Sequence, residues 1–395
     1  MSNRKFGIAV IGLGGAVGTT MVAGIELLKK GVIDTTGLPL ANLDTELTVD
    51  LPNYENIVFA GWDLFGEHLA KAAEEHDVLT HKQFVAVEEE LKKIKPWRAV
   101  ENKDFLTNIE GENKFSQNTS HREIIEKIRK NLQEFKTECA SAVVINLAST
   151  EKLADEGNEI FNSLASFEKA LDENSQEISP AMLYAYAAIA EQIPYGNFTP
   201  SVSADIPALI EFAENKQVPV AGKDGKTGQT MIKSVLAPAF RTRALKVEGW
   251  FSTNILGNRD GLALSNEESL RSKIKTKSSL LDSILGYPVE DHLVDIRYYR
   301  PRGDNKEAWD NIDLRGFLNQ PMQIKVNFLC KDSILAAPLA IEIARCLDLA
   351  KQRNEKGVLE EISIFFKMPM TKSKEKHAEN ALHRQEDILL DWLRR

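Results

Sequence analysis

The 395 residues predict an α/β fold, with buried parallel strands and an inserted α+β segment. Three features predict it. Short apolar runs alternate with helical stretches up to about residue 240, and a glycine-rich turn follows the first run. After Pro238 the pattern changes to strand-like runs around a helical stretch. Alternation of this kind is typical of a parallel sheet covered by helices, and the change marks a different segment.

The chain opens with KFGIAVIGLGGAVGTTMVAGIELLKKG, which predicts a strand, a glycine turn and a helix that ends at Gly31. NIVFAGWDL (56–64) and ASAVVINLAST (140–150) are apolar and β-branched, as strands buried on both faces are. MLYAYAAIAEQIPYGNFTPS and IPALIEFAENKQVPVAG each predict a helix followed by a strand. The first 240 residues therefore follow a β-α-β pattern.

Beyond Pro238, the strand-like runs KVEGWFSTNIL and MQIKVNFLC surround the helical NEESLRSKIKTKSSLLDSILG. Residues 333–354 then predict a long amphipathic helix, EISIFFKMPM a strand, and the last residues a charged helix. We therefore expect a first domain of residues 1–240, completed by 333–395, and an α+β domain of residues 241–332.

Composition excludes several classes of protein. Hydrophobic residues make up 43% and charged residues 27%, as in an ordinary globular protein. A net charge of −9 argues against nucleic acid as a partner, because binding to the phosphate backbone needs a basic surface. The opening apolar run is too short and glycine-rich for a membrane span, so we expect a cytoplasmic protein with no membrane partner.

Common catalytic and metal motifs are missing from the sequence. The three cysteines form no C-x-x-C pair, and the seven histidines show no ligand spacing. Neither G-x-S-x-G nor H-E-x-x-H occurs. A disulfide scaffold, a structural zinc site, a serine hydrolase and a zinc peptidase therefore have no support.

The turn GLGGAVG places its glycines between a strand and a helix, which is the setting of a Rossmann dinucleotide fingerprint; they are Gly12, Gly14, Gly15 and Gly18. Glycines allow close approach of the backbone, and the helix N-terminus offers N–H groups to a pyrophosphate. The last glycine comes one residue later than in G-x-G-x-x-G. A plain glycine-rich turn is the alternative, but the setting favours binding of a dinucleotide cofactor.

An acidic residue after the second strand should hold the adenosine ribose. The usual spacing points to Asp34 or Asp44, which lie in polar, turn-like sequence. Asp63 instead follows the convincing strand NIVFAGW, and we prefer it. Its alternative role is to cap a helix beginning in LFGEHLAKAAEE.

AGKDGKTGQT (221–230) looks like a shortened phosphate-binding P-loop. Only Lys223 and Asp224 stand between Gly222 and Gly225-Lys226-Thr227, whereas a Walker loop has four residues there. The loop therefore cannot wrap a nucleoside triphosphate in the usual way.

Lysines form the other pattern. Lys273 and Lys277 lie one helical turn apart, where an anion would relieve their repulsion, although two solvated lysines are the simpler reading. Lys367 interrupts the apolar run ISIFFKMP, where burial of a charge is costly unless it has a task. Lys306 lies in the turn GDNKEAWD; Asp332 begins a helix as an N-cap or as the partner of a lysine.

Taken together, these stretches resemble the myo-inositol-1-phosphate synthase family; the matching motifs are GLGGAVGTT, INLAST, AGKDGKTGQT, STNILGNRDG, SLRSKIKTKS, GDNKEAWD, KDSILAAPL and FFKMP. The resemblance spans nearly the whole chain, in the family's order. The compact length and YGNFTPS are similar to the shorter prokaryotic and archaeal branch. It implies a Rossmann-type NAD-binding domain, an inserted α+β domain for catalysis and tetramerisation, and a homotetramer.

The resemblance also implies the reaction, in which D-glucose 6-phosphate becomes 1L-myo-inositol 1-phosphate. NAD oxidises C5, C6 loses a proton, the enolate attacks the C1 aldehyde, and the hydride returns. Oxyanions at C5 and C1 call for ammonium groups, and proton transfer calls for lysines of lowered pKa. A divalent or monovalent cation is a further candidate cofactor. Asn258 replaces an aspartate of some archaeal relatives, which argues against their metal site, although Asp260 remains.

The family's site positions carry over residue by residue. Those matched to NAD are Gly12, Gly14, Gly15, Ala16, Val17, Gly18, Asp63, Ala148, Ser149, Thr150 and Asp224. Those matched to the substrate phosphate are Thr227, Gly228, Gln229, Thr230, Lys277 and Lys306. The catalytic positions are Lys273, Lys277, Lys306, Lys367, Asp224, Asp260, Asp332 and Asn254. Lys367 and Lys273 are expected to serve the hydroxyl protons and oxyanions.

Two other functions compete with this interpretation. A sugar-phosphate dehydrogenase that releases NADH shares the glycine turn and the phosphate loop but does not need four lysines. A non-catalytic NAD sensor would lack the lysine set, which this chain has.

Overall fold

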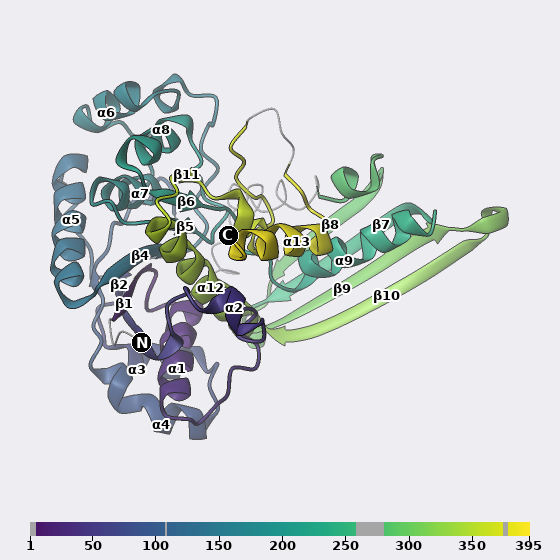
Figure 1. Ribbon diagram of the computed structural model, residues 1–395, viewed down its shortest axis with the longest axis horizontal. Helices are drawn as coiled ribbons and strands as arrows, with labels where there is room; N and C mark the ends of the chain where they lie inside the picture. The colour runs from purple at the N-terminus through teal and green to yellow at the C-terminus, as the bar shows by residue number, and fades with distance from the viewer. Residues whose placement is uncertain (1–4, 107–108, 258–279, 374–377) are drawn as a thin grey trace.

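The computed structural model describes residues 5–106, 109–257, 280–373 and 378–395. It contains two sheets, joined by the helices and loops around them (Figure 1). Within the described part of the chain, no helix combines the length and apolarity needed to cross a membrane.

The first sheet has seven parallel strands in the order β11-β6-β5-β4-β1-β2-β3. Their bounds are β1 (Phe6–Ile11), β2 (Ile57–Asp63), β3 (Trp97–Arg98), β4 (Ser141–Asn146), β5 (Tyr195–Asn197), β6 (Pro219–Ala221) and β11 (Gly357–Val358). The order reverses between β1 and β4, so a crevice opens at their carboxyl ends. The predicted Rossmann-type α/β fold is confirmed.

Helices cover both faces of this sheet. One face carries α1 (Ala16–Lys29), α3 (Leu69–His76), α4 (His81–Lys92) and α12 (Asp332–Gln352), with α2 (Thr45–Thr48) and α13 (Leu382–Leu393) beside them. The other carries α5 (His121–Glu138), α6 (Leu164–Asp172), α7 (Pro180–Ala190) and α8 (Pro207–Lys216). Side chains alternate between the faces along a strand, so Ile8 joins the first core and Ala9 the second. Burial on both faces explains why the strands read as continuous apolar runs.

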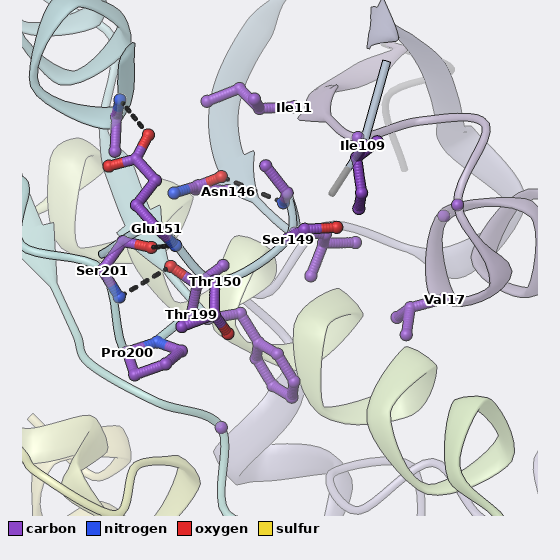
Figure 2. A pocket seen from close by; sticks show the side chains of 18 of the residues that line it. Ile11, Val17, Ile109, Asn146, Ser149, Thr150, Glu151, Thr199, Pro200 and Ser201 are labelled. Atoms are coloured by element: carbon purple, nitrogen blue, oxygen red, sulfur yellow. Dashed lines mark hydrogen bonds between the residues drawn. The ribbon is translucent and has the colours of Figure 1, made fainter. Parts of the chain in front are cut away.

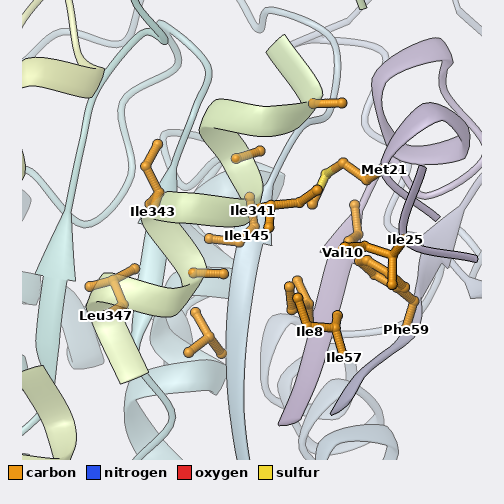
Figure 3. Packing of buried hydrophobic residues seen from close by; sticks show 14 of the residues in the cluster. Ile8, Val10, Met21, Ile25, Ile57, Phe59, Ile145, Ile341, Ile343 and Leu347 are labelled. Atoms are coloured by element: carbon orange, nitrogen blue, oxygen red, sulfur yellow. The ribbon is translucent and has the colours of Figure 1, made fainter. Parts of the chain in front are cut away.

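Helices α1 and α12, more than 300 residues apart in the chain, pack on the same strands. Figure 3 shows Met21 and Ile25 of α1 on one side of this core and Ile341 of α12 on the other, over the strand residues Ile8 and Ile145. A segment from the end of the chain thus completes the core of the first sheet.

The second sheet has the order β10-β9-β7-β8, with β7 (Lys246–Leu256), β8 (Asp291–Tyr298), β9 (Asn305–Arg315) and β10 (Pro321–Lys331). It extends away from the first sheet, and its long β9–β10 hairpin projects furthest (Figure 1). Helix α9 (Gly228–Thr242) covers one face, where Ala237 and Phe240 pack with Trp250 and Ile312.

We propose the domain division 1–240 with 333–395, and 241–332, because it follows the change from one sheet to the other. The boundary at residue 240 falls inside α9, whose second half packs on the second sheet. Helix α9 therefore connects the two parts.

The expected strand in EISIFFKMPM is instead a 3₁₀ segment, η5 (Glu360–Phe365), and that prediction was wrong. Residues three apart share one face of such a helix, so Ile362 and Phe365 are buried together. The next residue, Phe366, pairs with Gly225 in an isolated β-bridge and does not belong to either sheet. The remaining 3₁₀ turns are η1 (Tyr54–Asn56), η2 (Glu159–Phe161), η3 (Arg300–Arg302) and η4 (Phe317–Asn319).

Candidate active site

One cavity lies at the carboxyl ends of β1, β2 and β4 and reaches the second sheet. The expected site residues that line it are Gly12, Gly15, Ala16, Val17, Gly18, Asp63, Ala148, Ser149, Thr150, Asp224, Thr227, Gln229, Thr230, Asn254, Lys306, Asp332 and Lys367. Gly14 lies in the turn between β1 and α1, and Gly228 is the first residue of α9. Residues predicted from separate stretches of sequence are thus brought to one place.

The glycine turn leaves no room for side chains at two positions. Gly12 has a φ of +84°, and a Cβ there would lie 3.0 Å from the Ala148 Cα. A Cβ on Gly18 would lie 2.5 Å from the carbonyl oxygen of Leu13. Helix α1 follows with no side-chain cap and no acidic residue in its first turn, so its N–H groups and dipole favour an anion.

Asp63, the last residue of β2, holds this turn. Its Oδ2 accepts a hydrogen bond from Gly14 N at 2.8 Å, and its Oδ1 accepts one from Phe65 N at 3.0 Å. Helix α3 begins at Leu69 with His68 as its N-cap, so Asp63 is not a helix cap. Asp34 and Asp44 are exposed and do not line the cavity, which favours Asp63 for the ribose.

The loop after β4 forms the opposite wall. Figure 2 shows Ser149 and Thr150 at this wall, across the cavity from Val17 of α1. Asn146 Oδ1 accepts a hydrogen bond from Ala148 N at 3.1 Å, which fixes where the loop leaves the strand. This wall of the cavity therefore has a defined backbone shape.

Glu151 is a titratable group in this wall that sequence reasoning missed. It is buried, and it accepts a hydrogen bond from Ala181 N at 3.0 Å, in the first turn of α7. Burial raises the pKa of its carboxyl to about 7, against hydrogen bonds from Ser179 and Ala181 that lower it. Nothing in the sequence marks Glu151, because the effect comes from its surroundings.

The shortened loop 222–227 leads into α9 in the same way that the glycine turn leads into α1. Thr227 makes no side-chain cap hydrogen bond, and the first turn of α9 has no acidic residue. The N–H groups of a helix's first turn have no carbonyl partner within the helix. The backbone of Gly228, Gln229 and Thr230 therefore offers a second anion site to the cavity.

Lys367 and Asp224 form a buried ion pair beside this second N-terminus. Lys367 Nζ donates to Asp224 Oδ1 at 2.6 Å, and the Lys367 backbone N donates to Asp224 O at 2.7 Å. The side chains of Lys367 and Asp224 are 8% and 4% exposed. Pairing with Asp224 is what allows a lysine to interrupt the apolar run.

Lys306 and Asp332 form another ion pair, at 3.1 Å, between β9 and the start of α12. Asp304, and not Asp332, accepts hydrogen bonds from Ser333 N and Ser333 Oγ, at 3.1 and 2.8 Å. Of the two readings that the sequence left open for Asp332, partner of a lysine and helix N-cap, the structure supports the first.

Burial lowers the pKa of two further lysines near α9, and no sequence pattern marks either of them. Burial lowers the pKa of Lys226 to about 7, and its Nζ donates a hydrogen bond to Gln385 Oε1 of α13. Burial also lowers the pKa of Lys233 to about 8, and its Nζ lies 2.7 Å from His292 Nε2. Lys226 lies in the loop before α9, and Lys233 lies in α9 itself.

Three expected site residues lie outside the described residues, namely Asp260, Lys273 and Lys277, and so does Asn258. Among the residues that the structure describes, no three His, Cys, Asp or Glu side chains gather into a metal-binding group. We assign no cation ligands.

Comparison with known proteins gives consistent matches. The family model described as myo-inositol-1-phosphate synthase matches residues 6–394. Inositol-3-phosphate synthase 1 of Bacteroides thetaiotaomicron is 42% identical over 389 residues, covering 93% of this chain and 90% of that protein. Inositol-3-phosphate synthase 1 of Oryza sativa is 30% identical, covering 88% and 75%. The crystal structure of inositol-3-phosphate synthase from Caenorhabditis elegans superposes with a TM-score of 0.91 at 26% identity, covering 99% of this chain and 85% of that one.

Proposed function

The chain belongs to the myo-inositol-1-phosphate synthase family, and we propose that it converts D-glucose 6-phosphate into 1L-myo-inositol 1-phosphate with NAD. One observation carries the proposal. A single cavity combines a helix N-terminus beside the carboxylate of Asp63 with a second N-terminus beside the ion-paired Lys306 and Lys367. The first suits a dinucleotide and the second a sugar phosphate.

The glycine turn fits NAD, because a Cβ at Gly18 would meet backbone where the helix N–H groups must stay open to a pyrophosphate. Asp63 would accept hydrogen bonds from the adenosine ribose, and Ala148, Ser149 and Thr150 would border the nicotinamide ribose. When bound, NAD supplies a hydride acceptor that returns the hydride after ring closure.

The substrate phosphate would lie at the N-terminus of α9, with the backbone of residues 228–230 and the hydroxyls of Thr227 and Thr230 as donors. Lys306 would add charge from β9. We propose Lys277 for the same task, from the family position that it matches.

As a neutral amine, Lys367 would take the hydroxyl proton at C5, and the ammonium so formed would hold the oxyanion, with Asp224 fixing its position. Lys273 matches a family position that serves the same steps, and Asp332 would orient Lys306. We propose Asp260 and Asn254 as further active-site residues on the same ground.

The decisive experiment uses glucose 6-phosphate with much less NAD than substrate. A synthase forms many equivalents of cyclised inositol phosphate per NAD, since the hydride returns. A sugar-phosphate dehydrogenase instead accumulates NADH in proportion to its product. Stoichiometric NADH without inositol phosphate would overturn the proposal.

We also propose a homotetramer in which a second copy covers the open face of the second sheet. The register pairs Phe251 with Leu293 and Thr253 with Trp309, so Phe251, Leu293 and Trp309 share one face. They are 44%, 57% and 46% exposed, which is a large apolar area for water to contact. Sedimentation should give a tetramer, and Phe251→Asp should give smaller species; a wild-type monomer would contradict the proposal.

A further inference from the structure

A chain of buried hydrogen bonds runs from the second sheet to the cavity through Gln229. The side chain of Gln229 donates from Nε2 to Asp310 Oδ2 of β9 at 3.0 Å and to Trp309 O at 3.3 Å. Its Oε1 accepts from Asn254 Nδ2 of β7 at 2.5 Å. Asn254, Gln229 and Asp310 are 1%, 4% and 2% exposed. We call these three residues the amide relay.

The direction of the relay is set at Asp310. The Trp250 Nε1–H can only donate, and it donates to Asp310 Oδ1 at 2.7 Å. Ser252 Oγ donates to the same oxygen at 2.6 Å. An ionised carboxylate offers only acceptors, so Gln229 must turn its NH₂ group toward Asp310 and its oxygen toward Asn254. Asn254 must then donate its NH₂ to Gln229.

The consequence appears at the cavity. The remaining polar atom of Asn254, Oδ1, is buried and has no hydrogen-bond partner among the residues that the structure describes. Asn254 lines the cavity. A buried acceptor without a partner destabilises the empty site, and a donor on a ligand would satisfy it.

We propose that Asp310 is a positioning residue that fixes the polarity of the amide relay, so that Asn254 presents a carbonyl oxygen, and not an NH₂ group, to a hydroxyl of the sugar phosphate. The inference rests on the proposed function for the identity of that ligand. Asp310 acts through Gln229 and Asn254.

Asp310→Asn tests the proposal, because it reverses the relay with little change of shape. Trp250 still requires an acceptor, so the new amide places its oxygen there and its NH₂ toward Gln229. Gln229 then turns over, losing only the weaker contact with Trp309 O, and Asn254 presents NH₂ to the cavity. We expect kcat/KM for glucose 6-phosphate to fall by about ten- to a hundredfold, while NAD affinity and the thermal midpoint stay near wild type.

A second substitution should rescue the first. Asn254→Asp alone places a carboxylate oxygen against Gln229 Oε1, so that two acceptors face each other. This variant should also lower kcat/KM. In the double variant Asp310→Asn, Asn254→Asp, the reversed Gln229 donates to the new carboxylate, whose other oxygen faces the cavity as an acceptor. The double variant should therefore exceed both single variants. A purely structural role for Asp310 predicts no rescue from position 254.

Ser252→Ala is the matched control, because it removes one hydrogen bond to Asp310 without changing the direction of the relay. It should retain wild-type kcat/KM. Folded Asp310→Asn with wild-type kcat/KM, or a double variant that does not exceed both single variants, overturns the proposal. If Asp310→Asn alone does not fold, the comparison of Asn254→Asp with the double variant decides it.

Failure of the proposed function is seen separately, because wild type would then form no inositol phosphate. In that case four proteins, wild type, Asp310→Asn, Asn254→Asp and the double variant, are compared by calorimetric binding of glucose 6-phosphate in the presence of NAD. Loss of binding in the single variants and recovery in the double variant would still support the relay; equal binding by all four would overturn it.

Discussion

The cavity is faced by two helix N-termini, those of α1 and α9, that are alike in backbone and different in surroundings. Both follow a short loop after a strand, lack a side-chain cap and have no acidic residue in the first turn. At α1 the neighbouring charged group is the carboxylate of Asp63, which bonds to Gly14. At α9 the neighbours are the ion-paired Lys306 and Lys367.

The difference shows how one backbone arrangement can serve two anions. In a dinucleotide, the pyrophosphate is joined to a ribose, and a carboxylate is a suitable acceptor for hydrogen bonds from the ribose hydroxyls. A sugar phosphate that develops an oxyanion needs cations beside it. The α1 site uses residues of one β-α-β unit, whereas the α9 site uses residues from β7, β9, α12 and the segment after η5.

The largest effect is expected from Lys367→Ala, which removes one of the two ion-paired lysines at the α9 site. Loss of one preorganised charge at an oxyanion costs about 10²–10³ in rate, and a lysine that also moves a proton should cost more. NAD affinity should persist, because α1 is untouched. Product formation is measured on protein with a near wild-type thermal midpoint. The half-exposed Lys372, on the same segment, is the control, and Lys372→Ala should remain active.

Retention of more than about a tenth of wild-type turnover by Lys367→Ala would remove Lys367 from the chemistry. The site assigned around α9 would then need another cation.

Gly18→Val should disable the α1 site alone. Its side chain would meet the carbonyl oxygens of Leu13 and Gly12, at 2.5 and 2.9 Å from the Cβ, so the turn must move. Two or more charge-assisted hydrogen bonds of about 1.5 kcal/mol each would be lost, so NAD affinity should fall by about a hundredfold. Equilibrium titration with NAD gives the affinity.

Gly24, in the same helix, is the control for Gly18, because nothing lies within 4 Å of a Cβ there. Gly24→Ala should bind NAD normally and gain about 0.5–1 kcal/mol of stability. Unchanged NAD affinity in folded Gly18→Val would place the cofactor elsewhere.

A smaller effect is expected at the α9 site from Thr230→Val, which removes a hydroxyl and keeps the shape of the side chain. Loss of one charge-assisted hydrogen bond to phosphate, about 1.5 kcal/mol, should raise the KM for glucose 6-phosphate about tenfold. NAD affinity should not change. Thr242→Val, at the other end of the helix, controls for the substitution itself. Equal KM values for the two variants would show that the phosphate does not bind at the N-terminus of α9.

The smallest effect, for each pH unit, is on stability. The turn at 12–18 has no titratable side chain, whereas Lys226 before α9 has a pKa that burial lowers from 10.5 to about 7. Between these pH values the unfolded chain binds more protons than the fold, so stability rises with pH; below about 7 the contribution is constant. Lys226→Met should remove up to about 1.4 kcal/mol of that rise per pH unit.

Denaturant unfolding across this pH range measures the slope. Lys169→Met, at an exposed lysine of α6, should keep the wild-type slope. If Lys226→Met keeps it as well, the lysine is not neutral in the fold.

The sequence predicted those parts of the protein that depend on residues close together in the chain. The glycine turn could be read directly, because close approach and positive φ depend on the residue at that position. The strands β1, β2 and β4 could be read because burial on both faces leaves a continuous apolar run. The α9 site was recognised only through family motifs, since its residues are scattered along the chain.

The sequence by itself determined where the strands, the glycine turn and most helices form, because those depend on local backbone preference and hydrophobic period. Only the tertiary structure decided that EISIFF forms a 3₁₀ segment, that Lys367 pairs with Asp224, and that Glu151 is buried enough to raise its pKa. It alone also decided that Asp310 faces Gln229. Burial and pairing of charges depend on which distant segments fold against each other, and one-dimensional spacing does not encode that.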